Sequence, residues 1–171
     1  TGSSYDNVVT ISTSSTVANC RFEGVTGSSG NRRGYVISNG ITVASRITVV
    51  NNGGEGIIST STSAGQSIHI TQSVVANNGA TGIKSNSTAS QTDNWECHGC
   101  MITGNGTAGI DGNSAAARWV VQQNRLRDNT TNITGLGNYP TDLNNYTTDS
   151  DDASEYVSAG ANGDFTIKNT A

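Results

Sequence analysis

The sequence predicts an all-β fold: a right-handed single-stranded parallel β-helix, or solenoid, of about five to six coils with a short irregular C-terminal segment. Three observations predict it. One phrase recurs about every two dozen residues, short runs of Ile, Val and Thr alternate with polar residues, and Asn and Gly stand between the runs. Proline occurs once and charged residues make up 13% of the chain, which is not the composition of a disordered segment.

The recurring phrase ends in Gly-Ile in its three full copies. These are "TVVNNGGEGI" (48–57), "SVVANNGATGI" (73–83) and "MITGNGTAGI" (101–110), and a shortened "RLRDNTTNI" stands at 125–133. The steps are 22, 26, 27 and 23 residues along the column Tyr35, Ile57, Ile83, Ile110 and Ile133. They are 26, 27 and 24 residues along the column Asn52, Asn78, Asn105 and Asn129. Two landmarks that keep one period predict a stacked repeat.

Within one coil we expect strand, bend, strand and bend. Ile68 and Ile70 point to one face of a strand, and His69 points to the other. The segment 77–79, Asn-Asn-Gly, turns the chain, and we expect Asn-Gly to supply the positive φ angles of a sharp corner. The next strand begins at Ile83, and successive coils pair at a spacing of about 4.8 Å.

Two of these segments, "VQQNRLRDN" (121–129) and "SVVANNGATGI" (73–83), resemble the coil pattern of the right-handed parallel β-helix family, which includes pectate-lyase-like proteins and phage tailspikes. The ending "YVSAGANGDFTIKNTA" resembles a segment that follows the last coils in such proteins. The resemblance implies coils over 1–136 and a closing β segment over 156–171. Between them, 137–155 is expected to be an acidic loop or short helix. We expect the chain to be a fragment of a longer one.

Aligned coils predict three inward-facing columns. They are Cys20, Ile47, Ser73, Cys100 and Asn124; Phe22, Val49, Val75, Ile102 and Leu126; and Val17, Ala44, Ile70, Cys97 and Val121. Trp119 is expected to stack on Trp95. The three cysteines are therefore expected to be buried, unreactive thiols. The alternative for the pair Cys97 and Cys100 is a redox or metal site.

The resemblance implies that an enzyme of this family would act on the outer face of one sheet. The outward column after the Gly-Ile landmark is expected to hold Val36, Ile58, Lys84, Asp111 and Thr134. Two positions further are Ser38, Thr60, Asn86, Asn113 and Leu136. Lys84 above Asp111, flanked by Asn86 and Asn113, is a candidate sugar site. The alternative is a surface ion pair.

A second candidate lies on the neighbouring sheet, where His69 and Glu96 are expected to be vertical neighbours with His98 and Gln122 alongside. A His–carboxylate pair serves acid–base catalysis or holds a metal. Glycoside hydrolysis needs two carboxylates, and this face offers only Glu96. The alternative is ordinary surface decoration.

Two further clusters could bind ligands. The acidic run Asp149, Asp151, Asp152 and Glu155 could hold calcium through hard oxygens, although Ser150 followed by acids also fits the start of a short helix. No other cofactor is expected. Arg32 and Arg33, beside Tyr35 in the long first loop, could meet an acidic sugar; the alternative is a solvated loop tip.

The charge and hydropathy of the chain exclude two classes of partner. A net charge of −4 and a pI of about 4.9 argue against nucleic acid. No apolar run approaches the roughly 18 residues of a membrane span. We therefore expect a non-catalytic structural or adhesion module, extracellular or on a virion surface, such as part of a phage tail spike, fibre or capsid decoration.

Such a module would have carbohydrate as a candidate ligand. We expect a homo-oligomer, with trimers implied by the resemblance, or a larger assembly that covers the solenoid ends. The alternative function is a polysaccharide lyase or glycoside hydrolase.

Overall fold

The computed structural model describes residues 6–24, 32–60, 65–86, 94–112, 118–136, 140–143 and 145, which form three parallel sheets. Sheet A contains β1 (Asp6–Ile11), β4 (Arg32–Ile37), β7 (Ile57–Ser59), β10 (Ile83–Ser85), β13 (Ala108–Asp111) and β16 (Thr131–Thr134). Sheet B contains β2 (Ser15–Ala18), β5 (Ile41–Ser45), β8 (Ser67–Thr71), β11 (Asn94–His98), β14 (Arg118–Gln122) and β17 (Pro140–Leu143). Sheet C contains β3 (Arg21–Glu23), β6 (Thr48–Val50), β9 (Val74–Ala76), β12 (Met101–Thr103) and β15 (Arg125–Arg127).

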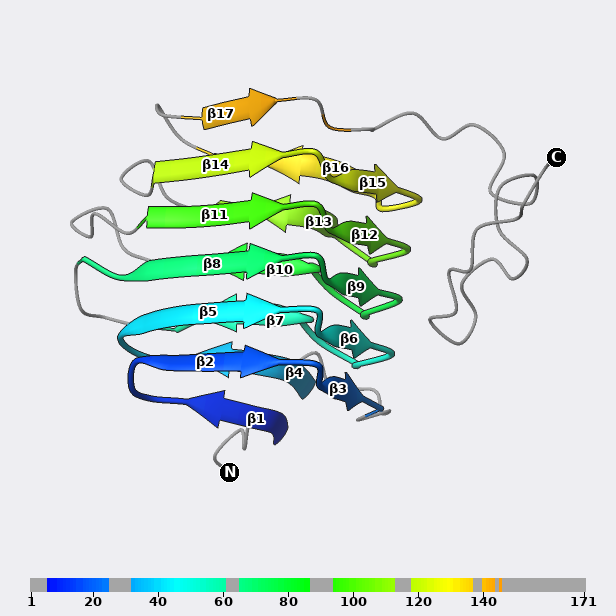
Figure 1. The fold of residues 1–171 in the computed structure, drawn as a ribbon. Helices are drawn as coiled ribbons and strands as arrows, with labels where there is room; N and C mark the ends of the chain where they lie inside the picture. The colour runs from blue at the N-terminus through cyan, green and yellow to red at the C-terminus, as the bar shows by residue number, and fades with distance from the viewer. Residues whose placement is uncertain are drawn as a thin grey trace, which may run out of the picture.

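The chain visits sheets A, B and C in turn, so each coil lies on the one before it (Figure 1). Ile83 is paired with Ile57 on one side and with Ile110 on the other. The predicted parallel β-solenoid is therefore confirmed.

Pairing continues past residue 136. Strand β17 pairs with β14, with Pro140 opposite Trp119 and Leu143 opposite Gln122. The prediction of a loop or helix over 137–155 is therefore wrong for 140–143, where proline takes the first position of an edge strand. The predicted closing segment 156–171 lies outside the described residues.

The interior follows the predicted columns. The alternating strands of sheet B bury Ala44, Ile70, Cys97 and Val121, which are register partners. Trp95 and Trp119 are paired and stacked, with ring centroids 4.7 Å apart. The side chains that pair across coils thus fill the space between the three sheets.

Two of the bends in a coil, from sheet B to sheet C and from sheet C to sheet A, are made at single residues with positive φ. At the bend from sheet B to sheet C these residues are Asn19, Arg46, Gln72, Gly99 and Gln123, with φ between 49° and 62°. At the bend from sheet C to sheet A they are Gly24, Asn51, Asn77, Gly104 and Asp128, with φ between 53° and 84°. The expectation that Asn-Gly itself supplies the positive φ is wrong, because the residue before it does.

The asparagine that follows the bend from sheet C to sheet A points inward, and these asparagines form a hydrogen-bonded ladder from coil to coil. Asn78 Oδ1 accepts from the backbone N–H of Asn52 (3.2 Å) and from its Nδ2 (2.9 Å). Asn78 Nδ2 donates onward to Asn105 Oδ1 (2.9 Å), and Asn105 Nδ2 donates to Asn129 Oδ1 (2.8 Å). These amides satisfy backbone groups that the bend removes from the sheets.

The recurring glycine exists because of this ladder. A Cβ on Gly56 would lie 2.7 Å from Asn78 Nδ2 and 2.7 Å from the oxygen of Gly82. A Cβ on Gly82 would lie 2.8 Å from Asn105 Nδ2. The motif N-x-x-x-G-I therefore follows from packing. The asparagine amide of the next coil occupies the space that a side chain at the glycine position would need.

The ladder ends at Asn132, which stands where the other coils have this glycine. Its Oδ1 accepts a hydrogen bond from Asn129 Nδ2 (3.0 Å), in the role that the next asparagine plays in the preceding coils. Strand β16, which carries Asn132, is the last strand of sheet A.

Candidate functional site on the outer face of sheet B

The outer face of sheet B carries three columns of side chains, and two of them form the candidate site. One column is Ile41, Ser67, Asn94 and Arg118. The other is Thr16, Val43, His69, Glu96 and Val120. His69 and Glu96 are register partners, as predicted.

Three of these side chains form a hydrogen-bonded chain. The distance from His69 Nδ1 to Glu96 Oε2 is 2.5 Å, and the distance from His69 Nε2 to Ser67 Oγ is 2.9 Å. An ionised carboxylate only accepts, so in the neutral tautomer that carries its proton on Nδ1 the ring donates to Glu96, and Nε2 is the nitrogen that can accept from the Ser67 hydroxyl. Side-chain exposures of 37% for His69 and 39% for Glu96 leave the chain open to solvent.

Ser67 was not among the residues singled out from the sequence. The signal was present in "SIH", because residues two apart on a strand lie on the same face. It was inconspicuous because serine is abundant in this chain.

His98 belongs to a separate contact. Its register partner is Gln122, as expected, but its Nε2 lies 2.5 Å from Oε1 of Gln123. The bend at Gln123 turns that side chain toward the ring.

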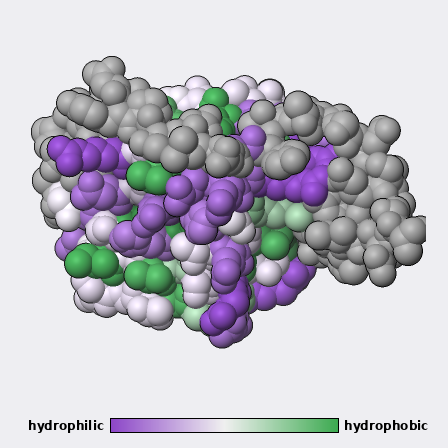
Figure 2. Space-filling view, turned by 45° about the horizontal axis from the view of Figure 1, so that its top comes forward, coloured by the Kyte–Doolittle hydropathy of each residue, from purple (hydrophilic) through white to green (hydrophobic). Residues whose placement is uncertain are grey.

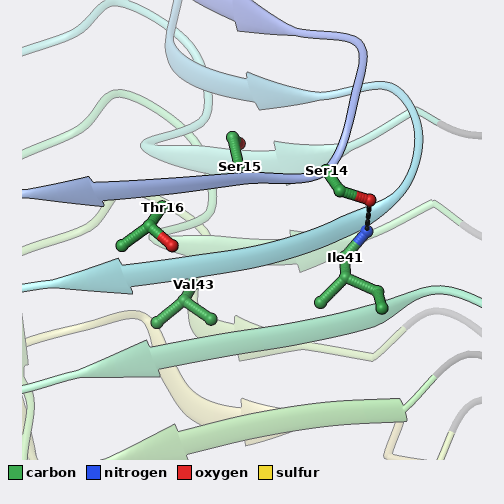
Figure 3. A pocket seen from close by; sticks show the side chains of 5 residues that line it. All are labelled: Ser14, Ser15, Thr16, Ile41 and Val43. Carbon is green, nitrogen blue, oxygen red and sulfur yellow. Dashed lines mark hydrogen bonds between the residues drawn. The ribbon is translucent and has the colours of Figure 1, made fainter.

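A depression lies beside Ser67 and His69. It has a volume of about 380 Å³ and is lined by Ser14, Ser15, Thr16, Ile41 and Val43 (Figure 3). Ser14 Oγ accepts from the backbone N–H of Ile41 (3.1 Å), and the Ile41 side chain is 55% exposed. Ile41 pairs with Ser67 and Val43 with His69, so the apolar wall adjoins the hydrogen-bonded chain. Elsewhere on the visible surface, hydrophilic side chains dominate (Figure 2).

The first candidate from the sequence, on sheet A, is less continuous than predicted. Lys84 and Asp111 are register partners and both are half-buried. The salt bridges among the described residues do not include this pair. Asn86 is exposed beside Lys84, and Asn113 lies outside the described residues.

The rest of that column differs from the prediction. Val36 and Ile58 were expected in the outward-facing column, yet their side chains are buried, with exposures of 3% and 1%. Leu136 was also expected outside and instead belongs to the hydrophobic core, because the positive φ of Gly135 shifts the alternation of side chains after β16. No exposed column therefore runs the length of this face in the part described.

The arginines predicted in a loop lie on a strand. Arg32 and Arg33 begin β4 and pair with β1. Arg33 Nε forms a half-buried salt bridge with Glu55 Oε2 at 3.1 Å. Tyr35 is fully buried and stacks on Phe22 with centroids 5.4 Å apart, and burial raises the pKa of its hydroxyl. Tyr35 is a core residue, so its prediction as a ligand contact is wrong.

The cysteines divide into two kinds. Cys97 and Cys100 are buried, as expected, whereas Cys20 is exposed because it belongs to the first coil of the stack. A hydrogen bond with Cys100, together with burial, raises the pKa of the Cys97 thiol well above its usual value. A raised pKa disfavours the reactive thiolate at Cys97, whereas the same hydrogen bond lowers the pKa of the Cys100 thiol.

The predicted calcium ligands Asp149, Asp151, Asp152 and Glu155 lie outside the described residues. Within the described part, no three His, Cys, Asp or Glu side chains are grouped to hold a metal ion. That part also contains no helix long and apolar enough to cross a membrane.

Comparison of the chain with protein-family models, with curated proteins and with solved structures gave no match.

Proposed function

We propose that this chain is a rigid structural or adhesion module of an extracellular or virion-surface assembly, such as a phage tail spike, fibre or capsid decoration. Its resemblance in coil pattern to phage tailspikes supports the viral setting. Carbohydrate is the proposed ligand class of its outer surface.

The observation that carries this proposal is the pair of internal hydrogen-bond ladders. The asparagine ladder runs from Asn52 to Asn129, and a second ladder includes Asn124 and Asn145, with Asn124 Nδ2 3.0 Å from Asn145 Oδ1. The asparagine ladder links successive coils through side-chain amides, and the second ladder does so through amides together with Ser73 and Cys100. Buried hydrogen-bond networks rigidify a fold, which suits a rod that bears load or displays a surface.

The proposal includes a partner that covers the N-terminal end of the stack. Strands β1, β2 and β3 are the outermost strands of their sheets in the described structure. Val9, Ile11, Val17 and Phe22 pack on the core yet are only partly buried. A solenoid end with apolar residues and a sheet edge is normally capped by another element. A homo-oligomer, or another component of the assembly, would supply this cover.

Two measurements test the proposal. Sedimentation equilibrium at micromolar concentration is expected to give a multiple of the 17.6 kDa chain mass. Affinity electrophoresis with acidic and neutral polysaccharides is expected to show retention by at least one polymer, with no release of unsaturated or reducing ends.

A monomeric chain that no polysaccharide retards would contradict the module and its ligand class. Release of unsaturated or reducing ends that is lost in Lys84→Ala or Asp111→Ala would replace the proposal with a polysaccharide lyase or glycoside hydrolase.

A further inference from the structure

We propose that Ser67, His69 and Glu96 act as nucleophile, general base and positioning residue in the hydrolysis of carboxylic esters with a short acyl chain. This activity goes beyond the proposed structural and carbohydrate-binding role, which assigns no chemical reaction to the outer face of sheet B.

The order of contacts carries the inference. The base must accept the proton of the nucleophile on one ring nitrogen and be oriented through the other. His69 meets Ser67 Oγ with Nε2 and Glu96 Oε2 with Nδ1. A surface ion pair requires only the second contact. The contact with Ser67 also brings a hydroxyl group to Nε2, the ring nitrogen that Glu96 does not occupy.

The backbone holds these three groups in place. Ser67 and His69 are two residues apart on β8, and Glu96 is the register partner of His69 on β11. Strand β8 is paired on both sides, with β5 and with β11. The separations among the three side chains are therefore set by sheet geometry, which is more rigid than a loop.

The step balances with water as the second reactant. Ser67 Oγ bonds to the ester carbonyl carbon while its proton passes to His69 Nε2. The bond from that carbon to the alcohol oxygen then breaks, and the alcohol leaves with the proton. Water attacks the acyl-serine, its proton passes through Nε2 back to Oγ, and the carboxylic acid is released.

The negative oxygen that develops on the carbonyl needs a donor. The amides of β8 are engaged in the sheet, so the donor must be a side chain. Asn94 is the register partner of Ser67 and is exposed, and its amide is a donor type that serves oxyanions. On the opposite side of Ser67, Ile41 and Val43 border the depression and offer an apolar wall to a short acyl group (Figure 3).

The first test is hydrolysis of 4-nitrophenyl acetate by the full chain. Ser67→Ala is expected to lower the rate at least about 100-fold, because it removes the nucleophile on which the covalent step depends. This variant keeps His69, so direct catalysis by the imidazole would survive in it. Ser45→Ala is the matched control, because it removes a serine hydroxyl from the next strand of sheet B that lies outside the chain of contacts. An unchanged rate in Ser67→Ala would overturn the proposal.

The second test is covalent. A fluorophosphonate probe is expected to add one label per chain, located on Ser67 by peptide mass spectrometry. Glu96→Gln is expected to slow labelling at least tenfold at an unchanged melting temperature, and Asn94→Ala to slow ester turnover. A purely structural Ser67 would take no label, and that result overturns the proposal. Ester hydrolysis removes an acyl group without cutting a polysaccharide backbone, so it produces no unsaturated or reducing ends. The esterase tests can therefore fail or succeed independently of the polysaccharide assays above.

Discussion

The bend from sheet C to sheet A and the bend from sheet B to sheet C have the same backbone conformation but different side chains. Both place one residue at positive φ and then one residue whose side chain points inward. After the first bend the inward residue is Asn52, Asn78, Asn105 and Asn129 in successive coils. After the second it is Ile47, Ser73, Cys100, Asn124 and Asn145, whereas Cys20 holds the same position in the first coil and is exposed.

The contacts show what the two bends share. In the asparagine ladder, Asn105 Oδ1 accepts from the N–H of Asn78 (3.2 Å), and Asn105 Nδ2 donates to the carbonyl of Val75 (3.2 Å). In the mixed ladder, Asn124 Oδ1 accepts from the N–H of Cys100 (2.8 Å), and its Nδ2 donates to the carbonyl of Cys97 (2.9 Å). Asn105 and Asn124 therefore each serve two backbone groups of the preceding coil.

Serine and cysteine fill this role in part. Ser73 Oγ accepts from the N–H of Ile47 (3.2 Å). The Cys100 thiol lies 3.5 Å from the carbonyl of Ile70, and the backbone of Ser73 hydrogen-bonds its sulfur. Small polar groups fill this place in three successive coils, at Ser73, Cys100 and Asn124, whereas the apolar Ile47 fills it in the coil before them. Only the first bend combines such groups with a glycine column, and there asparagine recurs.

The largest effect is expected from Asn105→Ala. The change removes the acceptor of the buried N–H and Nδ2 of Asn78 and one donor to the carbonyl of Val75, and each buried group left unpaired costs about 1–3 kcal/mol. We expect urea unfolding to show a loss of roughly 3–5 kcal/mol. Asn94→Ala, at an exposed amide, is the control and should cost under about 0.5 kcal/mol. Similar losses in both variants would contradict the ladder.

Gly82→Ala should be the next most severe. Its Cβ would lie 2.7 Å from the oxygen of Gly109 and 2.8 Å from Asn105 Nδ2. Relief requires movement of a backbone or of the ladder, so we expect a loss of about 2–3 kcal/mol in thermal or urea unfolding. The control is Gly99→Ala, where a Cβ meets nothing closer than 4.0 Å and only the φ of 62° costs about 1 kcal/mol. Equal losses in Gly82→Ala and Gly99→Ala would mean that close packing does not require the recurring glycine.

The mixed ladder should tolerate exchange among polar residues. Cys100→Ser keeps a donor and acceptor at the place of the sulfur, and we expect a loss under about 1 kcal/mol. Cys100→Ala removes both and should cost about 1–3 kcal/mol, measured in the same unfolding assay. Equal losses of stability in Cys100→Ser and Cys100→Ala would contradict this, because they would mean that the sulfur contributes by packing and not by hydrogen bonding.

The smallest expected effect is on the pH dependence of stability. Burial raises the pKa of Tyr35, so the native state keeps its proton at pH values where the unfolded chain has lost it. The free energy of unfolding should therefore fall as pH rises from about 10, the usual tyrosine value, through the native pKa. Tyr35→Phe should flatten this fall in urea titrations between pH 9 and 11. Cys97 is present in both proteins, so its own titration cancels in the comparison.

Much of the fold could be predicted from particular residues. The spacing of Ile57, Ile83 and Ile110 predicted the stack, and the pairing of Trp95 with Trp119 was predicted from the same alignment. His69 and Glu96 were also placed together correctly. These succeed because a parallel stack gives residues of equal phase in successive coils the same height and face.

The sequence by itself determined the architecture and which residues are vertical neighbours, because the period alone carries that information. Only the tertiary structure decided which neighbours touch: that Ser67 meets His69, that Cys20 is left exposed, and that 140–143 pairs with β14. Such contacts depend on side-chain rotamers and on what covers each coil, and a one-dimensional repeat specifies neither.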